Sequence, residues 1–192
     1  DPQTIFSHLM PGASSTDLLH DAVTMSVSAR REGERILVDV TIVNDKTGHH
    51  VPTDSPLRQL ILLVQAEGPD GIALTQAGGP AIPDYGGVGD PSQGHYAGLP
   101  GKIYAKILME LWTQVTPSGA YWNPTRIISD NRLATFASDT STYAFAAPDE
   151  GKVTIEVALL FRRAFKAIMD HKGWDTPDIV MVQQTTSLAG GE

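Results

Sequence analysis

Two adjacent histidines, His49 and His50, are the residues of this chain whose type is best suited to binding a metal. They lie in the polar segment 44–58, between two apolar runs that are typical of β-strands. A neutral imidazole is the commonest protein ligand of transition metals, and loops held by a rigid framework often carry binding residues. In an extended segment neighbouring side chains point to opposite sides, so at most one of the two histidines is expected to reach a given metal.

Four further histidines are weaker candidates for the same role. His8 lies in a short N-terminal segment, and His20 lies just before the first predicted strand. A lone histidine in such a place usually forms a surface hydrogen bond. His95 lies in a long loop, and His171 lies near the end of a predicted helix, where its simplest role is to favour the negative end of the helix dipole.

Composition excludes several kinds of partner and site. Fourteen basic and twenty-two acidic residues give the 192-residue chain a formal net charge of -8. That sign disfavours a phosphate backbone or an anionic membrane surface, so we expect neither nucleic-acid binding nor membrane insertion. No apolar run reaches the roughly 18 residues that a membrane helix needs. The chain has no cysteine, which excludes disulfides, cysteine zinc sites and a Cys-x-x-Cys-His haem attachment within it.

Catalytic motifs are absent from the sequence. Ser55 is close to the two adjacent histidines, but no Gly-x-Ser-x-Gly elbow is present to support a nucleophile. The glycines of segment 84–90 are not followed by Gly-Lys-Ser or Gly-Lys-Thr, and its acidic residues lack the alternation of a calcium loop. We therefore expect a non-catalytic domain and not an enzyme.

Hydrophobic periodicity predicts mainly β-strands. Segment 35–44 alternates apolar and polar residues, as a half-buried antiparallel strand does. Segment 57–67 is apolar on both faces in its middle, which predicts a central strand covered on both sides. Turn residues then predict two hairpins, one from that strand to 72–74 and the other from 141–146 to 153–161.

Four further segments complete the set of expected elements. Alternation in 102–112 favours a strand over a short amphipathic helix, and 179–186 is the last predicted strand. A helix is predicted at 162–172, with Gly173 as a left-handed stop. The loop 76–101 contains eight glycines and four prolines, and its length indicates a connection that is either functional or poorly ordered.

These elements predict an all-β fold, an immunoglobulin-like antiparallel β-sandwich with one long Gly/Pro-rich loop and one short C-terminal helix. The length and the 41% hydrophobic content suit one sizeable core, so we expect a single domain over residues 1–192, with 1–22 as a lead-in segment. The sequence begins at Asp1 with neither a basic region nor an apolar signal core. We expect either that a leader has been removed or that the chain is a piece of a longer protein.

The segment Gly48-His49-His50-Val51-Pro52-Thr53 resembles the Gly-His-x-x-Pro-Thr-Gly signature in the haem-free C-terminal β-domain of certain multihaem c-type cytochromes. Where that pattern has glycine, this chain has Asp54, whose β-carbon disfavours a positive φ angle. Four other segments resemble pieces of the same domain in the same order, so that the resemblance covers most of residues 8–186: they are 8–12, 130–133, 160–165 and 173–181.

The resemblance implies an accessory or interaction domain attached to an N-terminal haem-bearing domain of the same protein, outside the cytoplasm, in electron transfer. Haem c is then bound in the rest of the protein and none is bound covalently in this chain. His49 matches the motif histidine and His8 is the second candidate, as distal ligands to haems held by that N-terminal part. The ordinary alternative is that His49 only ties down its own loop through hydrogen bonds.

Two other functions are consistent with the residues. The first is a secreted β-sandwich module that binds carbohydrate or protein, with Tyr121 and Trp122 as a stacking platform beside the long loop. The second is a small metalloenzyme that uses His8, His49 or His50 together with carboxylates, which requires three convergent ligands and an open position.

Overall fold

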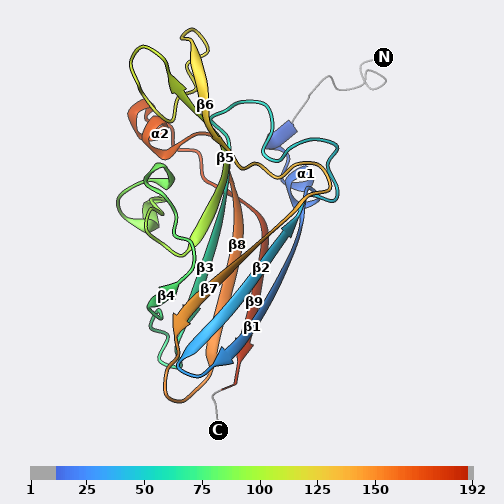
Figure 1. Ribbon diagram of the computed structural model, residues 1–192, viewed down its shortest axis with the longest axis vertical. Helices are drawn as coiled ribbons and strands as arrows, with labels where there is room; N and C mark the ends of the chain where they lie inside the picture. Colours follow the sequence, from blue (N-terminus) through green and yellow to red (C-terminus); the bar gives the residue numbers. More distant parts are fainter. Residues whose placement is uncertain (1–11, 190–192) are drawn as a thin grey trace, which may run out of the picture.

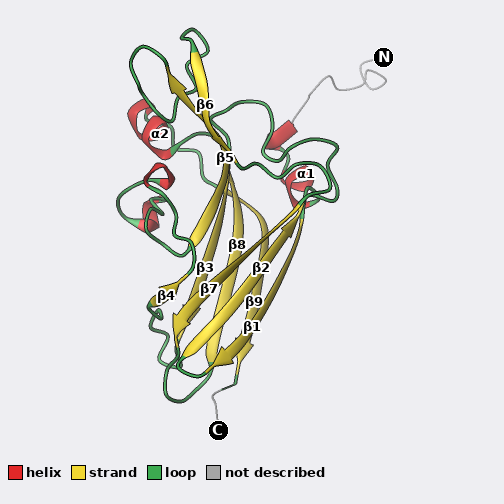
Figure 2. Cartoon of the chain, viewed as in Figure 1, coloured by secondary structure: helices red, strands yellow, loops and turns green. Residues whose placement is uncertain are grey.

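The computed structural model, shown in Figure 1, describes residues 12–189. Within that range the chain forms mainly β-strands, with two short α-helices (Figure 2). The helices are α1 (Thr16–His20) and α2 (Lys166–Lys172). The strands are β1 (Thr24–Glu32), β2 (Arg35–Val43), β3 (Gln59–Glu67), β4 (Gln76–Gly78), β5 (Gly101–Glu110), β6 (Thr125–Asp130), β7 (Ser138–Ala146), β8 (Val153–Arg162) and β9 (Ile179–Leu188).

The strands form two antiparallel sheets, which confirms the prediction of an all-β sandwich. One sheet has the order β1-β2-β7-β4 and the other has the order β6-β5-β3-β8-β9. The alternation predicted for 35–44 is observed in β2, where Ile36, Val38, Val40 and Ile42 are buried and the residues between them are partly exposed. These apolar side chains belong to the main core, which is built from both sheets. Removing such branched side chains from water is the main favourable contribution to folding.

Strand β3 is covered on both sides, as its sequence predicts. Leu60, Leu62 and Val64 belong to the main core, whereas Ile61 belongs to a second, smaller core on the outer face of the sheet. Residues of the long loop and of α2 cover that outer face, among them Ile82 and Ile168. A strand buried on both faces reads as a continuous apolar run.

The first predicted hairpin forms only as a short antiparallel contact, and the second is wrong. After β3 the returning segment makes only a single bridge, between Glu67 and Ala73, and the chain then crosses to the other sheet, where β4 pairs with β7. Strands β7 and β8 also lie in different sheets, so the turn between them connects the two layers. Turn residues reverse the chain equally well within a sheet and between sheets, because both arrangements turn the apolar faces toward the same core.

The predicted helix at 162–172 starts later than expected. Strand β8 continues through Arg162, which pairs in register with Gln59 of β3, and α2 begins at Lys166. The predicted stop is confirmed, because Gly173 adopts the left-handed conformation with φ 65°. The strand at 102–112 is confirmed as β5, whereas no predicted range covers β1, β4, β6 or α1.

The long loop is ordered around one buried arginine. Arg162 has a relative exposure of 1%, donates hydrogen bonds to the carbonyl oxygens of Gly86 (2.9 Å) and Gly94 (2.7 Å), and pairs with Asp178 at 2.6 Å. Its guanidinium also lies 5.1 Å from the centre of the Tyr96 ring. The loop also contains two 3-10 helices and backbone hydrogen bonds of its own, and this side chain of β8 ties two of its turns to the sandwich.

The longer connections gather at one end of the sandwich, at the top of Figure 1, which we call the loop end. It carries α1, α2, the segment 44–58 and the extension between β5 and β6. The opposite end, which we call the turn end, carries three tight connections and the C-terminal end of β9. Among the described residues, no helix is long and apolar enough to cross a membrane.

Candidate functional site

The segment that carries His49 is held by one buried amide. Asn44 is fully buried, and its Nδ2 donates to the carbonyl oxygens of His49 (2.8 Å) and Leu133 (3.0 Å). Its Oδ1 accepts from the Thr47 hydroxyl at 2.5 Å. Val51 then pairs with Leu133 as an isolated antiparallel bridge. The backbone on both sides of His49 is therefore fixed to the sandwich, as a preorganised binding loop requires.

His49 presents one ring nitrogen to the outside. Its side chain is exposed, and Nδ1 lies 2.9 Å from the carbonyl oxygen of His50. A carbonyl only accepts hydrogen bonds, so Nδ1 carries the proton and Nε2 of the neutral ring keeps a free lone pair. Histidines that bind metals through Nε2 typically donate Nδ1–H to a carbonyl or carboxylate in this way.

A pocket of about 490 Å³ lies beside His49. Its wall is mainly apolar, and its charged lining residues are two cations, Lys46 and Arg58, and one acid, Asp21. The apolar wall includes Leu18, Leu19, Ala22, Val51, Pro52 and Phe161. Such a pocket suits a mainly apolar ligand that carries negative charge at its edge.

The turn that follows Thr53 contains a residue in the left-handed conformation that is not glycine. Asp54 has φ 68°, at the position where the family pattern has glycine. Aspartate enters this region more readily than most residues, because its short polar side chain forms local contacts. Here the carboxylate pairs with Arg58 at 3.1 Å, and Arg58 also donates to the carbonyl of Thr53 at 3.3 Å. Asp54 therefore adopts the left-handed conformation in spite of its β-carbon.

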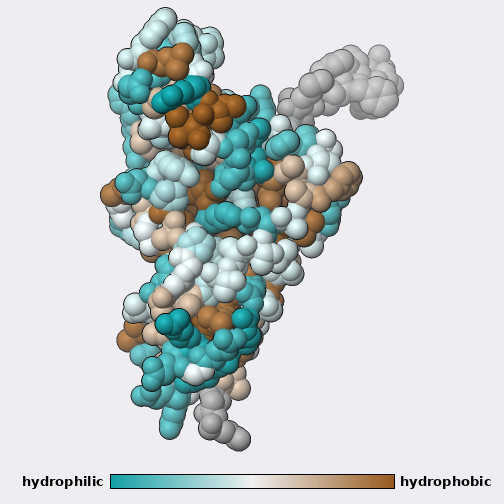
Figure 3. All heavy atoms as spheres, in the orientation of Figure 1, coloured by the Kyte–Doolittle hydropathy of each residue, from teal (hydrophilic) through white to brown (hydrophobic). Residues whose placement is uncertain are grey.

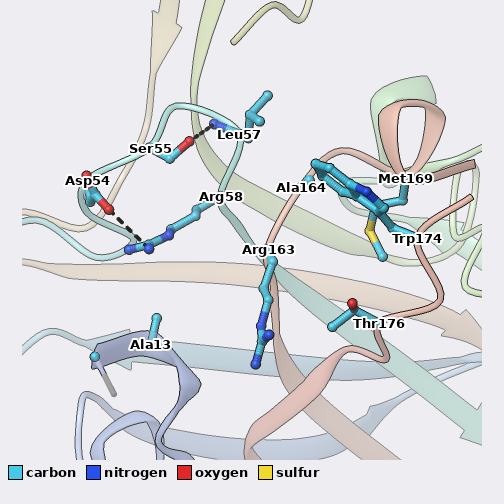
Figure 4. A pocket seen from close by; sticks show the side chains of 11 residues that line it. Ala13, Asp54, Ser55, Leu57, Arg58, Arg163, Ala164, Met169, Trp174 and Thr176 are labelled. Carbon is cyan, nitrogen blue, oxygen red and sulfur yellow. Dashed lines mark hydrogen bonds and ion pairs between the residues drawn. The ribbon is translucent and has the colours of Figure 1, made fainter. Parts of the chain in front are cut away.

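A second pocket of about 810 Å³ adjoins the first and is shown in Figure 4. Arg58 lines both pockets, and the second also contains Arg163, Met169 and Trp174. Arg163 extends from the end of β8 and forms no hydrogen bond or ion pair with any other residue in the range 12–189. The two pockets together form a hollowed, cationic surface at the loop end, on a chain whose net charge is -8.

The arginines of this surface were not singled out as site residues by sequence reasoning. The available signal was the pair Arg162-Arg163 directly after a strongly apolar strand. Successive side chains of a strand point to opposite faces, so one arginine enters the second core and the next faces the pocket. The role of Arg58 has no comparable signal, because it depends on where the turn at Asp54 lies.

The remaining candidate histidines are dispersed. His50 is exposed, His20 bonds the carbonyl of Val180 at 3.0 Å, and His171 lies in the last turn of α2. His95 is 3.7 Å from Asp170 and lies against the long loop. His8 lies outside the described residues. Within the part of the chain that the structure describes, no three histidine, aspartate or glutamate side chains lie close enough to hold a metal ion.

Tyr121 and Trp122 lie on the exposed extension between β5 and β6. Their relative exposures are 92% and 71%, and their rings are 5.0 Å apart with an angle of 81° between the planes. Two nearly perpendicular rings do not present one flat face on which a sugar can stack. None of the three pockets described for this chain joins residues of this extension to the long loop.

Comparison with known proteins shows a likeness in three-dimensional structure. No known family model matches the chain, and no curated protein matches it. A penta-haem cytochrome c552 from Thermochromatium tepidum has a similar structure, with a TM-score of 0.66 over 92% of this chain and a sequence identity of 17%. This chain spans 42% of the length of that protein. At this identity the likeness shows a shared fold.

Proposed function

We propose that this chain is a non-catalytic accessory domain of an extracytoplasmic multihaem cytochrome involved in electron transfer. In this proposal its loop end contacts an N-terminal haem-bearing domain of the same protein, and His49 donates a distal ligand to a haem there. The shared fold with part of a penta-haem cytochrome supports the first statement. Because the chain has no cysteine, any haem c is attached to another part of the protein.

The observation that carries the proposal is the hydrogen bond of His49. Nδ1 is occupied by the carbonyl of His50 and Nε2 is open, on a loop that Asn44 holds in place. The neighbouring pocket is mainly apolar, and its two cations, Lys46 and Arg58, outnumber its one acid, Asp21, which suits the apolar edge and anionic propionates of a porphyrin. A haem would supply the redox chemistry, and this chain would supply a ligand and a covering surface. His8 remains the second proposed ligand, outside the described residues.

The adjacent histidine provides a matched control for the test. In the full-length protein, His49→Ala should convert one low-spin haem to a high-spin form in optical and electron paramagnetic resonance spectra, and free imidazole should restore the low-spin signal. His50→Ala should leave the spectra unchanged, because His50 is also exposed but does not line the pocket beside His49. Unchanged axial ligation in His49→Ala would overturn the ligand role. His8→Ala tests the second candidate in the same way.

The domain assignment has its own test. Repeated Cys-x-x-Cys-His motifs in the full-length sequence before Asp1 would support it, whereas a leader peptide alone would favour a secreted binding module. The perpendicular rings of Tyr121 and Trp122 favour a protein partner over a carbohydrate in that alternative. Metal analysis of the purified protein tests the metalloenzyme alternative.

A further inference from the structure

Strand β6 and the extension between β5 and β6 carry a group of exposed hydrophobic side chains, which we call the apolar tip. Figure 3 shows hydrophobic atoms gathered at this end of the molecule. Single exposed hydrophobic residues are ordinary, but a contiguous group of this kind marks an interaction site. Its members and their relative exposures are Leu111 45%, Trp112 75%, Val115 53%, Tyr121 92%, Trp122 71%, Ile127 57% and Ile128 49%.

The composition of the apolar tip is that of a protein interface. The segment 111–129 contains one charged residue, Arg126, in a chain that has 36 basic and acidic residues in all, 14 and 22 respectively. The centres of protein interfaces are depleted in charge and enriched in tryptophan, tyrosine and arginine. These same three residue types supply most of the strongly contributing positions in interfaces.

The apolar tip is held in one conformation by a buried carboxylate. Glu110 has a relative exposure of 7% and accepts hydrogen bonds from Thr113 (2.5 Å), Ser118 (2.8 Å) and Asn123 (2.8 Å). These three donors come from different parts of the connection between β5 and β6. The aromatic side chains of the apolar tip therefore lie on an ordered backbone, which lowers the conformational entropy lost on binding.

The apolar tip is continuous with the proposed haem-facing surface. Gly119 lies so close to Leu57 that a β-carbon added there would be 2.3 Å from Leu57 Cδ2. Leu57 and Arg58 line the second pocket, and Arg58 also lines the pocket of His49. The connection that carries the apolar tip thus packs against a wall residue of the second pocket, and Arg58 joins that pocket to the pocket of His49.

We propose that the apolar tip docks into an apolar groove on the haem-bearing domain of the same protein. This inference rests on the proposed function and adds a second point of attachment to it. Three aromatic rings that each bury about 150–250 Å² supply much of the roughly 800 Å² per partner of a standard interface. His49 would then contribute ligation, and Trp112, Tyr121 and Trp122 would contribute most of the buried area.

Two other partners, a second copy of this chain and a membrane, fit the apolar tip less well. Strand β6 is an edge strand, but its register shifts between Ile107 and Leu108, so that Ile128 has no partner on β5. Such a bulge interrupts the edge and opposes pairing with the β6 of a second copy. A membrane is disfavoured because the tip offers one cation, Arg126, on a chain with a net charge of -8.

Hydroxyl-radical footprinting of the full-length haem protein tests the inference without any substitution. Trp112, Tyr121 and Trp122 should lose labelling down to the level of Tyr104, which is 1% exposed. Ile72, which is 65% exposed at the turn end, should label as a free side chain. Labelling of the three aromatic residues at the rate of free side chains would overturn the inference. If His49→Ala still changes the haem spectra in that case, the proposed function stands without the docking surface.

The other occupants give distinct results that also overturn the inference. Protection that disappears on dilution together with a dimer in sedimentation would assign the apolar tip to a second copy. Protection that appears only when phosphatidylcholine vesicles are added would assign it to a membrane. Paired variants complete the test: Trp112→Ser with Trp122→Ser should expose Tyr121 to labelling in the full-length protein, whereas Ile72→Ser should not. Unchanged protection of Tyr121 in the double variant would contradict a role for these rings in docking.

Discussion

The two ends of the sandwich hold their connections by different means. At the turn end, the connections are short and use glycines with positive φ, namely Gly33 (59°), Gly71 (74°) and Gly151 (93°). At the loop end, long connections are organised by three buried polar side chains, Asn44, Glu110 and Arg162. Short turns satisfy their own backbone groups, whereas a long loop needs a partner from elsewhere in the fold.

The two ends also differ in what they present to solvent. The turn end exposes charged residues, which keep water and are poor interface centres. They include Glu34, Asp70, Asp149 and Glu150. The loop end exposes the apolar tip, two cationic pockets and His49. The loop end, whose long connections depend on buried polar side chains, is therefore also the end that carries the candidate binding surfaces.

The largest effect of breaking this arrangement is expected at Arg162. Arg162→Met removes donors to the carbonyls of Gly86 and Gly94 and leaves Asp178 unpaired. Removing one partner of a buried ion pair costs about 3–5 kcal/mol, so chemical denaturation should show a loss of that order in the free energy of unfolding. Arg163→Met is the matched control and should change it by less than about 0.5 kcal/mol. Equal losses for the two variants would contradict the anchoring role.

A smaller loss is expected at Asn44. Asn44→Ala removes the amide that bridges the carbonyls of His49 and Leu133, although Leu133 keeps its bond from the Val51 amide, and the loss of both bonds should lower the free energy of unfolding by about 2 kcal/mol. Hydrogen exchange should also accelerate in the segment 45–53. Lys46→Ala, at an exposed neighbouring position, serves as the control. A variant as stable as the original protein would show that the loop does not depend on this amide.

A glycine at the turn end should give an effect of about half that size. Gly33→Ala places a β-carbon at φ 59°, which should cost roughly 1 kcal/mol in thermal or chemical unfolding. Gly48→Ala in the histidine segment is the comparison, because Gly48 does not have a positive φ and has open space around its α-carbon. It should leave stability unchanged. A larger loss of stability for Gly48→Ala than for Gly33→Ala would mean that local turn strain does not distinguish the two ends.

The smallest effect is expected from protonating Glu110. The hydrogen bond from Thr113, followed by those from Ser118 and Asn123, holds the pKa of this carboxyl below its ordinary value of 4.5. A depressed folded-state pKa means that the stabilisation is fully present above the ordinary value and is lost as pH falls through the folded value. Hydrogen exchange in 111–124 should therefore accelerate at low pH. Glu110→Gln should remove that pH dependence, and a persistent dependence would assign it to another acid.

The strands were largely predictable because their pattern is local. Alternation in β2 and the two-faced run of β3 follow from burial against one core or two, and the sequence carries that information residue by residue. Sheet membership was not predictable, and for that reason the hairpin from β7 to β8 was wrong and the one after β3 forms only as a short contact. The choice between pairing within a sheet and crossing to the other sheet depends on contacts between distant strands.

The candidate site, like the fold, has features that the sequence predicted and features that only the tertiary structure decided. The types and spacing of His49 and His50 predicted that one imidazole at most reaches a given metal, and the absence of cysteine excluded a covalent haem attachment within this chain. Only the tertiary structure decided which nitrogen is free and what surrounds it, because those depend on Asn44 reaching Leu133, 89 positions away. The apolar tip likewise became a surface only when Glu110 and Leu57 positioned it, since hydrophobic residues in a sequence do not reveal whether a fold will cover them.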